Sequence, residues 1–319
     1  MRHTSIPPLF LSVLATFAGC TGSRAANTEP TVVQQGAPRP ARGRVADHVI
    51  IISVDGLRPD AIAKYEAKTI QRMMREGRYS LTAQTISISK TLPSHTSMLT
   101  GVDSDVHGIT WNSDKTGEFG HVKVPTVFGV ARTAGFSTAA FFSKTKFHHI
   151  DVPSTIDHMR APTGGVIPWN ARKTVDLMRD HLDERSPNLL FVHLADADFA
   201  GHNFGWMGWM YGMAVREVDL AVANVIAAAD ERFGRGGYTV ILTADHGGHR
   251  KSHGTTDPVD TTIPWIVWGA GVQRGDTLSG IRTMDTAATA LWMLGLETPS
   301  SFVGRPVIGA FEPSLAARR

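Results

Sequence analysis

Aspartate and histidine side chains stand at the ends of apolar, strand-like runs of this sequence or in the segments that follow them. The six side chains in question are, in chain order, Asp55, Asp198, His202, Asp245, His246 and His253. Carboxylate oxygens and imidazole nitrogens are ligands of Zn²⁺, and six such ligands suffice for two ions with three each. Ions bound in this way keep an open position for a substrate or a nucleophile. Because burying several carboxylates together is costly unless cations neutralise them, the pattern predicts a metal site.

Two pairs of residues within this set differ in how strongly they indicate a metal site. Asp198 and His202 stand four residues apart, so a turn or a first helical turn would bring both side chains to one side. Taken alone, such a pair is more often an ordinary hydrogen-bonded pair at a helix start. Asp245 and His246 precede two glycines, which let the backbone approach a ligand closely. The second pair is therefore the sharper indication of a metal site.

Thr91 supplies the hydroxyl that covalent chemistry at such a site would need. It stands in the segment KTLPSH, in which Pro93 is well placed for the first turn of a helix. Thr91 would then lie at a helix N-terminus, which favours anions and a lowered hydroxyl pKa. Thr91 is therefore the candidate nucleophile.

Strands and helices alternate along the chain in a way that would position these residues. Strand-like runs lie at 48–54, 137–142, 189–194, 238–243 and 264–268, and helix-like segments include 60–76, 213–233 and 285–294. This alternation predicts an α/β fold, in which a single domain has a mostly parallel central sheet with helices on both faces. Ligands of such sheets bind at the carboxyl ends of the strands, which is where Asp55, Asp198 and Asp245 stand.

The composition is that of an ordinary globular protein. Of the 319 residues, 42% are hydrophobic and 19% are charged, so the chain can build a large core. The formal net charge is +3, and part of the basic excess lies in Arg24, Arg39, Arg42 and Arg44. Proteins that bind nucleic-acid backbones cluster Lys and Arg, and no comparable run follows Asp47. We therefore expect no nucleic-acid partner.

The N-terminus has the features of an exported lipoprotein. Residues 1–19 combine Arg2 with a short apolar run and end in small residues directly before Cys20, as in a signal peptide. The order Phe-Ala-Gly-Cys resembles the bacterial lipobox, in which the cysteine receives lipid, so Cys20 is the predicted lipidation site. Cleavage nearby without lipidation is the alternative. Since Cys20 is the single cysteine, no intramolecular disulfide is expected in either case.

This pattern divides the chain into three segments. Residues 1–19 are the predicted signal peptide, residues 20–47 are a flexible tether rich in Gly, Pro, Ala, Gln and Arg, and residues 48–319 are the catalytic domain. We expect the protein to be exported to the periplasm or the cell surface. A lipid anchor at Cys20 would be its contact with a membrane.

Six ordered segments resemble the alkaline-phosphatase superfamily, and most closely its nucleotide pyrophosphatase/phosphodiesterase branch. They are residues 53–60, 90–95, 107–109 with Asn112, 198–202, 245–247 and 253–254. The resemblance spans most of the chain, from Val54 to about Val267. It implies an alkaline-phosphatase-like fold and a hydrolase with two zinc ions that acts on small phosphate esters or nucleotides.

The resemblance also implies a role for each site residue. The implied ligands of one zinc are Asp55, Asp245, His246 and Thr91, and those of the other are Asp198, His202 and His253. His249 competes with His253 for the last place, but His253 fits the family pattern better. Asn112 would hold a phosphoryl oxygen. Thr91 would attack phosphorus in line, the second zinc would stabilise the leaving oxygen, and water would later hydrolyse the phospho-threonine intermediate.

The substrate stays open between two classes of ester. Ser94 and Leu92 stand where the family more often has asparagine and an aromatic residue. A phosphomonoesterase of the same superfamily is therefore the nearest alternative to a phosphodiesterase. Lys144 and Lys146 would bind the phosphoryl group in a substrate-binding role, since some monoesterases of the superfamily place a similar pair there, or they are solvated loop lysines. A non-catalytic, metal-binding surface lipoprotein is the alternative from another class.

Residues near the ligands also have structural interpretations. Four aromatic side chains follow His202, namely Phe204, Trp206, Trp209 and Tyr211. We expect most of them to pack beneath the metal site, and a wall for an apolar leaving group is the alternative. Asp196 and Asp257 stand near candidate ligands, and we expect them to orient those ligands.

Overall fold

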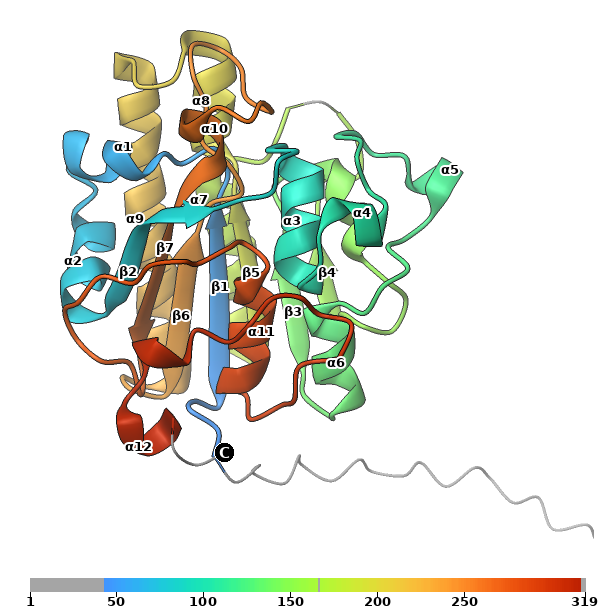
Figure 1. The fold of residues 1–319 in the computed structure, drawn as a ribbon, viewed down its shortest axis with the longest axis vertical. Helices are drawn as coiled ribbons and strands as arrows, with labels where there is room; N and C mark the ends of the chain where they lie inside the picture. Colours follow the sequence, from blue (N-terminus) through green and yellow to red (C-terminus); the bar gives the residue numbers. More distant parts are fainter. Residues whose placement is uncertain (1–42, 166, 317–319) are drawn as a thin grey trace, which may run out of the picture. The chain divides into compact units, whose positions relative to one another are not determined.

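A seven-stranded sheet forms the centre of the protein (Figure 1). The computed structural model describes residues 43–165 and 167–316, so the predicted signal peptide, Cys20 and most of the predicted tether lie outside the described residues. The strands lie side by side in the order β2 (Arg78–Gln84), β7 (Thr262–Gly269), β6 (Tyr238–Thr243), β1 (His48–Val54), β5 (Leu189–Leu194), β3 (Thr138–Phe141) and β4 (His158–Arg160).

The three central strands β6, β1 and β5 are parallel and end close to one another. β1 pairs with β5 as far as Val54 opposite Leu194, and with β6 as far as Ser53 opposite Thr243. All residues of these strands except His48 are buried. Burial on both faces requires mostly apolar side chains, which explains the unbroken runs in the sequence. Because the strands end together, the side chains that follow them meet at one edge of the sheet.

Helices cover both faces of the sheet (Figure 1). One face carries α1 (Pro59–Lys64), α2 (Lys68–Glu76), α7 (Ala171–Glu184) and α9 (Trp209–Phe233), and the other carries α3 (Thr91–Thr100), α6 (Val127–Thr133) and α11 (Asp285–Met293). α8 (Asp196–Phe204) follows the carboxyl end of β5 and packs against α9. The predicted α/β fold with a mostly parallel sheet is confirmed.

Shorter elements complete the chain between these layers. They are α4 (Ser104–His107), α5 (Thr116–Phe119), the 3-10 helix η1 (Thr145–Ile150), α10 (Pro258–Thr261), the 3-10 helix η2 (Ile308–Ala310) and α12 (Pro313–Ala316).

In the helical layer that contains α9, Asp219 accepts hydrogen bonds from the N–H groups of Thr69 and Ile70, at 2.9 Å each. These groups lie in the first turn of α2, which has no intrahelical partners for them, so Asp219 caps that helix.

The structure differs from the predicted elements in three ways. The predicted helix at 60–76 is two helices, because Tyr65 ends α1 and Glu66 has a positive φ of 54°. Sequence patterns miss β2 and β4, since β2 is partly exposed and β4 has three residues. β7 runs antiparallel to both of its neighbours.

The residues just before β1 already contact the folded domain, although the predicted tether extends to Asp47. The N–H group of Val45 donates to the carbonyl oxygen of Met293 at 2.8 Å, and Ala46 is buried. Among the residues that the structure describes, no helix is long and apolar enough to cross a membrane.

Candidate active site

The first group of predicted metal ligands lies where β1 and β6 end. The Nε2 atom of His246 lies 3.4 Å from Oδ1 of Asp55 and 3.2 Å from Oδ2 of Asp245, and all three side chains are fully buried. Gly56, with φ of +71°, follows Asp55 directly, and a Cβ atom there would lie 3.0 Å from the Cα atom of Asp198. Only glycine therefore lets the end of β1 approach the start of α8 this closely.

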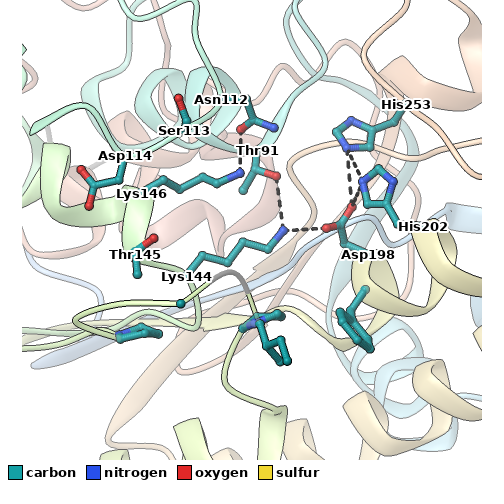
Figure 2. Close-up of a pocket in the computed structure, with 15 residues that line it drawn as sticks. Thr91, Asn112, Ser113, Asp114, Lys144, Thr145, Lys146, Asp198, His202 and His253 are labelled. Carbon is teal, nitrogen blue, oxygen red and sulfur yellow. Dashed lines mark hydrogen bonds and ion pairs between the residues drawn. The ribbon is translucent and has the colours of Figure 1, made fainter.

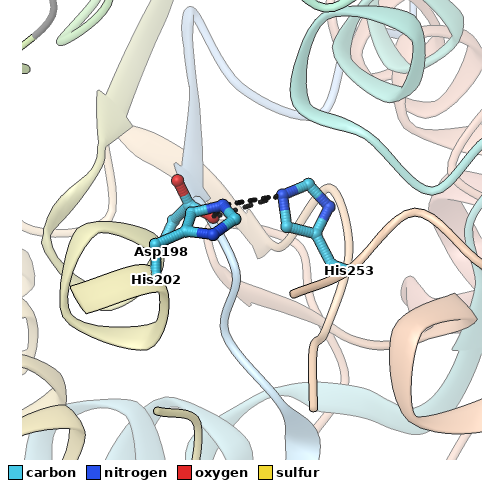
Figure 3. Close-up of side chains that lie close together, drawn as sticks. All are labelled: Asp198, His202 and His253. Carbon is cyan, nitrogen blue, oxygen red and sulfur yellow. Dashed lines mark hydrogen bonds and ion pairs between the residues drawn. The ribbon is translucent and has the colours of Figure 1, made fainter. Parts of the chain in front are cut away.

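The second group comes from α8 and from the loop after β6 (Figure 3). Asp198 and His202 lie one turn apart in α8, so the four-residue spacing places them on one side of the helix. The Nε2 atoms of His202 and His253 are 3.1 Å apart. They lie 3.3 and 3.6 Å from Oδ1 of Asp198. The structure thus brings together all three residues expected in this group.

The three histidines of these groups are held in the same tautomer. Each Nδ1 atom faces a backbone carbonyl oxygen, that of Lys251 for His202 at 3.0 Å, Gly247 for His246 at 2.8 Å and Ser89 for His253 at 2.8 Å. A carbonyl oxygen only accepts, so Nδ1 carries a proton, and in the neutral ring Nε2 presents a lone pair. Lone pairs that face carboxylates repel them unless a cation lies between, and metal-binding histidines are oriented in this way.

Four buried polar atoms at this edge have no hydrogen-bond partner among the described residues. They are Oδ1 of Asp55, Oδ1 of Asp198, Oδ2 of Asp245 and Nε2 of His246. Buried polar atoms are seldom left unpaired in proteins. All four belong to predicted ligands, and bound cations would satisfy them, so the residues fit a site for divalent metal.

The donor atoms form two groups that share one carboxylate. One group is Asp198, His202 and His253, the other is Asp55, Asp198 and His246, and within each the donor atoms lie within 4.8 Å of one another. Asp198 thus lies close enough to contribute to either group, whereas the assignment of Asp245 to the first zinc stays a prediction. Asp245 nevertheless stays beside His246, while its Oδ2 atom also lies 3.3 Å from Nδ1 of His95.

Two further buried histidines hold the site in place, and the sequence analysis assigns neither a role. Nε2 of His193 donates to Oδ2 of Asp55 at 2.9 Å, while its Nδ1 accepts the N–H group of Ser143 at 3.2 Å. Burial lowers the pKa of His193 to about 4, which keeps it neutral. His95 donates from Nδ1 to the carbonyl oxygen of Thr91 at 2.8 Å. The available signal for His193 was a lone histidine in the apolar run LLFVHL.

The candidate nucleophile stands at the start of a buried helix. α3 begins at Thr91, as the position of Pro93 predicts, and all ten of its residues are buried. The Thr91 side chain borders a pocket of about 390 Å³ (Figure 2). Lys90, the N-cap residue, makes no side-chain hydrogen bond to the helix. The helix N-terminus thus offers its positive end to an anion in the pocket.

Asn112 and Lys146 line the same pocket and contact each other. Oδ1 of Asn112 accepts hydrogen bonds from the N–H group of Leu92 at 2.9 Å and from Nζ of Lys146 at 3.0 Å. Both contacts use the amide oxygen, so Nδ2 of Asn112 is left to donate to a bound ligand. Burial, together with the neighbouring charge of Lys144, lowers the pKa of Lys146 to about 8.

Lys144 contacts the carboxylates of Asp55 and Asp198 instead of standing free in the pocket, and Figure 2 shows its contact with Asp198. Its Nζ atom is 2.6 Å from Oδ2 of both Asp55 and Asp198, and 3.4 Å from Oγ1 of Thr91. Burial acts to lower the pKa of Lys144, but the two carboxylates outweigh it and raise that pKa above its usual value. Burial acts to raise the pKa of Asp55, but Lys144 and His193 hold it well below its usual range.

Other predicted residues lie away from the ligands. Nδ1 of His249 contacts Oδ1 of Asp260 at 2.8 Å, which favours His253 as the ligand. Asp196 and Asp257 accept backbone N–H groups at the starts of α7 and α10. The prediction that these two aspartates orient metal ligands is therefore wrong, because their carboxylates accept hydrogen bonds from N–H groups at helix N-termini.

The aromatic residues after His202 divide into two kinds. Trp206 and Tyr211 are buried, and both donate to the carbonyl oxygen of Gly56, at 3.0 and 2.9 Å. The predicted packing beneath the site is confirmed for these two. Phe204 and Trp209, in contrast, are 54% and 73% exposed, so the prediction that most of the four pack beneath the site is wrong.

Comparison with known proteins identifies the family. The model of the type I phosphodiesterase / nucleotide pyrophosphatase family matches residues 49–267. The chain belongs to this family. Family and fold together support an enzyme of phosphoryl transfer or phosphate-ester hydrolysis, of a superfamily that binds divalent metals.

The chain matches parts of curated relatives that are much longer than it is. GPI ethanolamine phosphate transferase 1 of Candida glabrata is 29% identical over 147 residues, which are 40% of this chain and 16% of the relative. The Homo sapiens protein of that name is 23% identical over 281 residues, which are 81% and 29%. A 2,3-bisphosphoglycerate-independent phosphoglycerate mutase of Gloeobacter violaceus is 29% identical over 188 residues, which are 52% and 32%. The alignments thus span at most 32% of these relatives.

Solved structures share the fold at low sequence identity. Murine ectonucleotide pyrophosphatase / phosphodiesterase 5 has a TM-score of 0.69 at 14% identity, over 83% of this chain and 100% of that one. An inactive variant of it in complex with AMP has a TM-score of 0.68 at 14% identity, over 83% and 98%. A 2-O GAG sulfatase has a TM-score of 0.68 at 14% identity, over 86% and 75%. At these identities, the structures show that this chain shares their fold.

Proposed function

We propose that the protein is a two-zinc hydrolase of phosphate esters that acts on phosphodiesters or nucleotides through a phospho-threonine intermediate. The observation that carries the proposal is the position of Thr91. This residue is the first of α3, and it borders the pocket beside the carboxylates and histidines. The neutral Nε2 donors and carboxylate oxygens form a ligand set that suits zinc. The family match and the murine relative solved with AMP support a phosphodiester or nucleotide substrate.

The residues of the pocket divide the work of the proposed reaction. When bound, zinc would neutralise the carboxylates, lower the pKa of the Thr91 hydroxyl and offset charge on the phosphoryl group. The Thr91 oxygen bonds to phosphorus, the bond to the leaving ester oxygen breaks, and water later hydrolyses the phospho-threonine. Nδ2 of Asn112 donates to a phosphoryl oxygen, and Lys146 balances its charge. Turnover without any added acceptor distinguishes hydrolysis from transfer.

The test replaces Thr91 and measures metal on the same samples. Thr91→Ala is expected to lower turnover of a nitrophenyl diester by at least about 10³-fold while the zinc content stays at two per chain, because the other ligands remain. Thr91→Ser, which keeps a hydroxyl, is the matched control and retains part of the activity. Unchanged turnover in Thr91→Ala would leave the mechanism without a nucleophile. No turnover of any phosphate ester by the zinc-loaded wild type would favour the metal-binding surface lipoprotein.

A phosphomonoesterase of the same superfamily is the second candidate. It is favoured by Lys144 and Lys146, which both border the pocket. A monoester carries more negative charge than a diester and gains more from such cations. Rates on a nitrophenyl monoester and a nitrophenyl diester separate the two functions.

We further propose that the protein is exported and held at a membrane by lipid on Cys20, in the periplasm or at the cell surface. Its support is the N-terminal sequence, in which small residues precede the single cysteine. Cys20→Ala is expected to move the protein from the membrane fraction to the soluble fraction. Equal membrane association of the two forms would count against the anchor.

A further inference from the structure

A second hollow, of about 360 Å³, lies beside the catalytic pocket. The two share Ile167, Pro168 and Phe199 as lining residues, so they are adjacent. α8 and α9 contribute most of its remaining wall, including Phe204 and Met213. The volume falls within the range of small-molecule sites.

The wall of this hollow exposes large apolar side chains to solvent. Phe199 and Met213 are each 42% exposed, Phe204 is 54% exposed and Ile167 is 72% exposed. Apolar groups gathered around one hollow of a soluble domain mark a binding surface more often than a chance exposure. Met213 adds a flexible thioether that adapts to the shape of a ligand.

Two polar side chains of the hollow each bind a backbone N–H group of the protein. Oδ1 of Asn170 accepts the N–H group of Lys173 at 2.9 Å, and Oδ2 of Asp196 accepts that of Ala171 at 2.7 Å. Both bonds satisfy the start of α7, and the remaining acidic residue, Glu217, is exposed to solvent. The interior therefore favours hydrocarbon over a nucleobase, whose ring atoms require hydrogen-bond partners.

We propose that this hollow binds the hydrocarbon part of the ester's organic group, an alkyl chain or an aryl ring, while the phosphoryl group lies at Thr91. Phe199 lies between Asp198 and His202 in α8 and lines both spaces. An organic group that leaves the phosphoryl site past Phe199 reaches the apolar wall directly. The inference rests on the proposed function and adds a substrate class to it, amphiphilic phosphate esters.

The test compares ethyl phosphate with hexyl phosphate, titrated calorimetrically into the zinc-loaded protein below the concentration at which hexyl phosphate aggregates. Hexyl phosphate is expected to bind at least about tenfold tighter, since full burial of four methylenes would give roughly 200-fold and the hollow is open on one side. The double variant Phe204→Ser, Met213→Ser is expected to reduce this ratio to about two or less. Both residues are partly exposed, so the variant keeps its fold.

Leu220→Ser is the matched control, because Leu220 lies in α9, as Met213 does, is 58% exposed and does not line the hollow. It is expected to retain the wild-type ratio. Equal affinities of the wild type for both ligands, or a hexyl preference that persists in the double variant, would overturn the proposal. So would AMP binding that exceeds hexyl phosphate binding and weakens in the double variant, which would indicate a nucleobase site.

Two further outcomes separate this proposal from neighbouring ones. If the double variant loses co-sedimentation with phosphatidylcholine vesicles while the wild type binds both phosphates equally, the apolar wall contacts membrane and the proposal fails. If ester turnover is absent but the hexyl preference depends on Phe204 and Met213, the hydrolase proposal fails while the hollow still binds hydrocarbon. If turnover depends on Thr91 and chain length has no effect on binding, the hydrolase stands without this subsite.

Discussion

Lys144 and Lys146 stand two residues apart and yet meet different partners. Lys144 is held by the carboxylates of Asp55 and Asp198, at 2.6 Å each. Lys146 instead contacts the neutral oxygen of Asn112, and burial followed by the charge of Lys144 lowers the pKa of Lys146 to about 8. Lys146 is therefore the cation that a phosphoryl group in the pocket would satisfy first.

Replacing Lys146 tests whether this lysine, and not Lys144, balances the charge of the substrate's phosphoryl group. Lys146→Ala is expected to lower kcat/KM about tenfold for a nitrophenyl monoester and about threefold for a nitrophenyl diester, because the monoester carries the larger charge. Lys123→Ala, at an exposed lysine outside the pocket, is the control and leaves both rates unchanged. A strong wild-type preference for the monoester that disappears in a Lys144→Ala, Lys146→Ala double variant would contradict the phosphodiesterase proposal.

The packing of α7 on the outer strands of the sheet includes a pair of stacked imidazoles. His181 of α7 lies on His158 of β4 with ring centroids 4.1 Å apart and an angle of 21°. Phe141 of β3 borders both rings. Burial, followed by the charge of His158, lowers the pKa of His181 to about 4. Protonation of this ring is therefore disfavoured in the folded protein.

His181 makes the stability of this region depend on pH. Its folded pKa of about 4 lies below the unfolded value of about 6.5, so between these values the unfolded chain binds a proton that the native protein does not. The free energy of unfolding therefore falls as the pH drops through this window. His181→Phe keeps a stacked ring and is expected to lose about 1 kcal/mol less than the wild type between pH 7 and pH 5.

Urea unfolding at both pH values, with a chelator in every sample, measures this difference. The chelator removes the contribution of metal release at low pH. Equal losses for the variant and the wild type would show that the imidazole of His181 is already as easily protonated in the native protein as in the unfolded chain.

At the scale of the whole molecule, the sheet gathers negative charge at one edge. Parallel strands β1, β5 and β6 end together, and each delivers an aspartate to the site. Within the described part of the chain, the buried atoms left without partners at this edge are those that cations would contact. Metal binding is thus expected to stabilise the entire domain, because the unfolded chain has no such site.

Removal of metal should therefore lower the melting temperature. A chelator is expected to reduce the Tm of the zinc-loaded protein by roughly 10 °C, the change for a ligand present at about a thousand times its Kd. Added Zn²⁺ should restore the Tm, whereas Mg²⁺, which prefers oxygen ligands in octahedral geometry, should not. Differential scanning calorimetry measures both effects. An unchanged Tm after chelation would contradict a metal site built from these six residues.

The sequence by itself determined the central strands and most of the metal-facing side chains. A strand buried on both faces requires an unbroken apolar run, and the residue after such a run lies at the carboxyl edge of a parallel sheet. Asp55 and Asp245 follow from this rule alone. Pro93 likewise marked the start of α3, and with it the place of Thr91. The partly exposed β2 and the three-residue β4 were not predicted, because they lack an unbroken apolar run.

Only the tertiary structure decided which side chains meet. His193 holds Asp55 from 138 residues away, and Lys144 joins Asp55 to Asp198 across segments far apart in the chain. The orientation of Asn112 depends on the N–H group of Leu92 at the start of another element. Local periodicity reports burial and secondary structure, whereas such contacts depend on strand register and helix packing across the whole domain. For that reason, the sequence alone did not predict them.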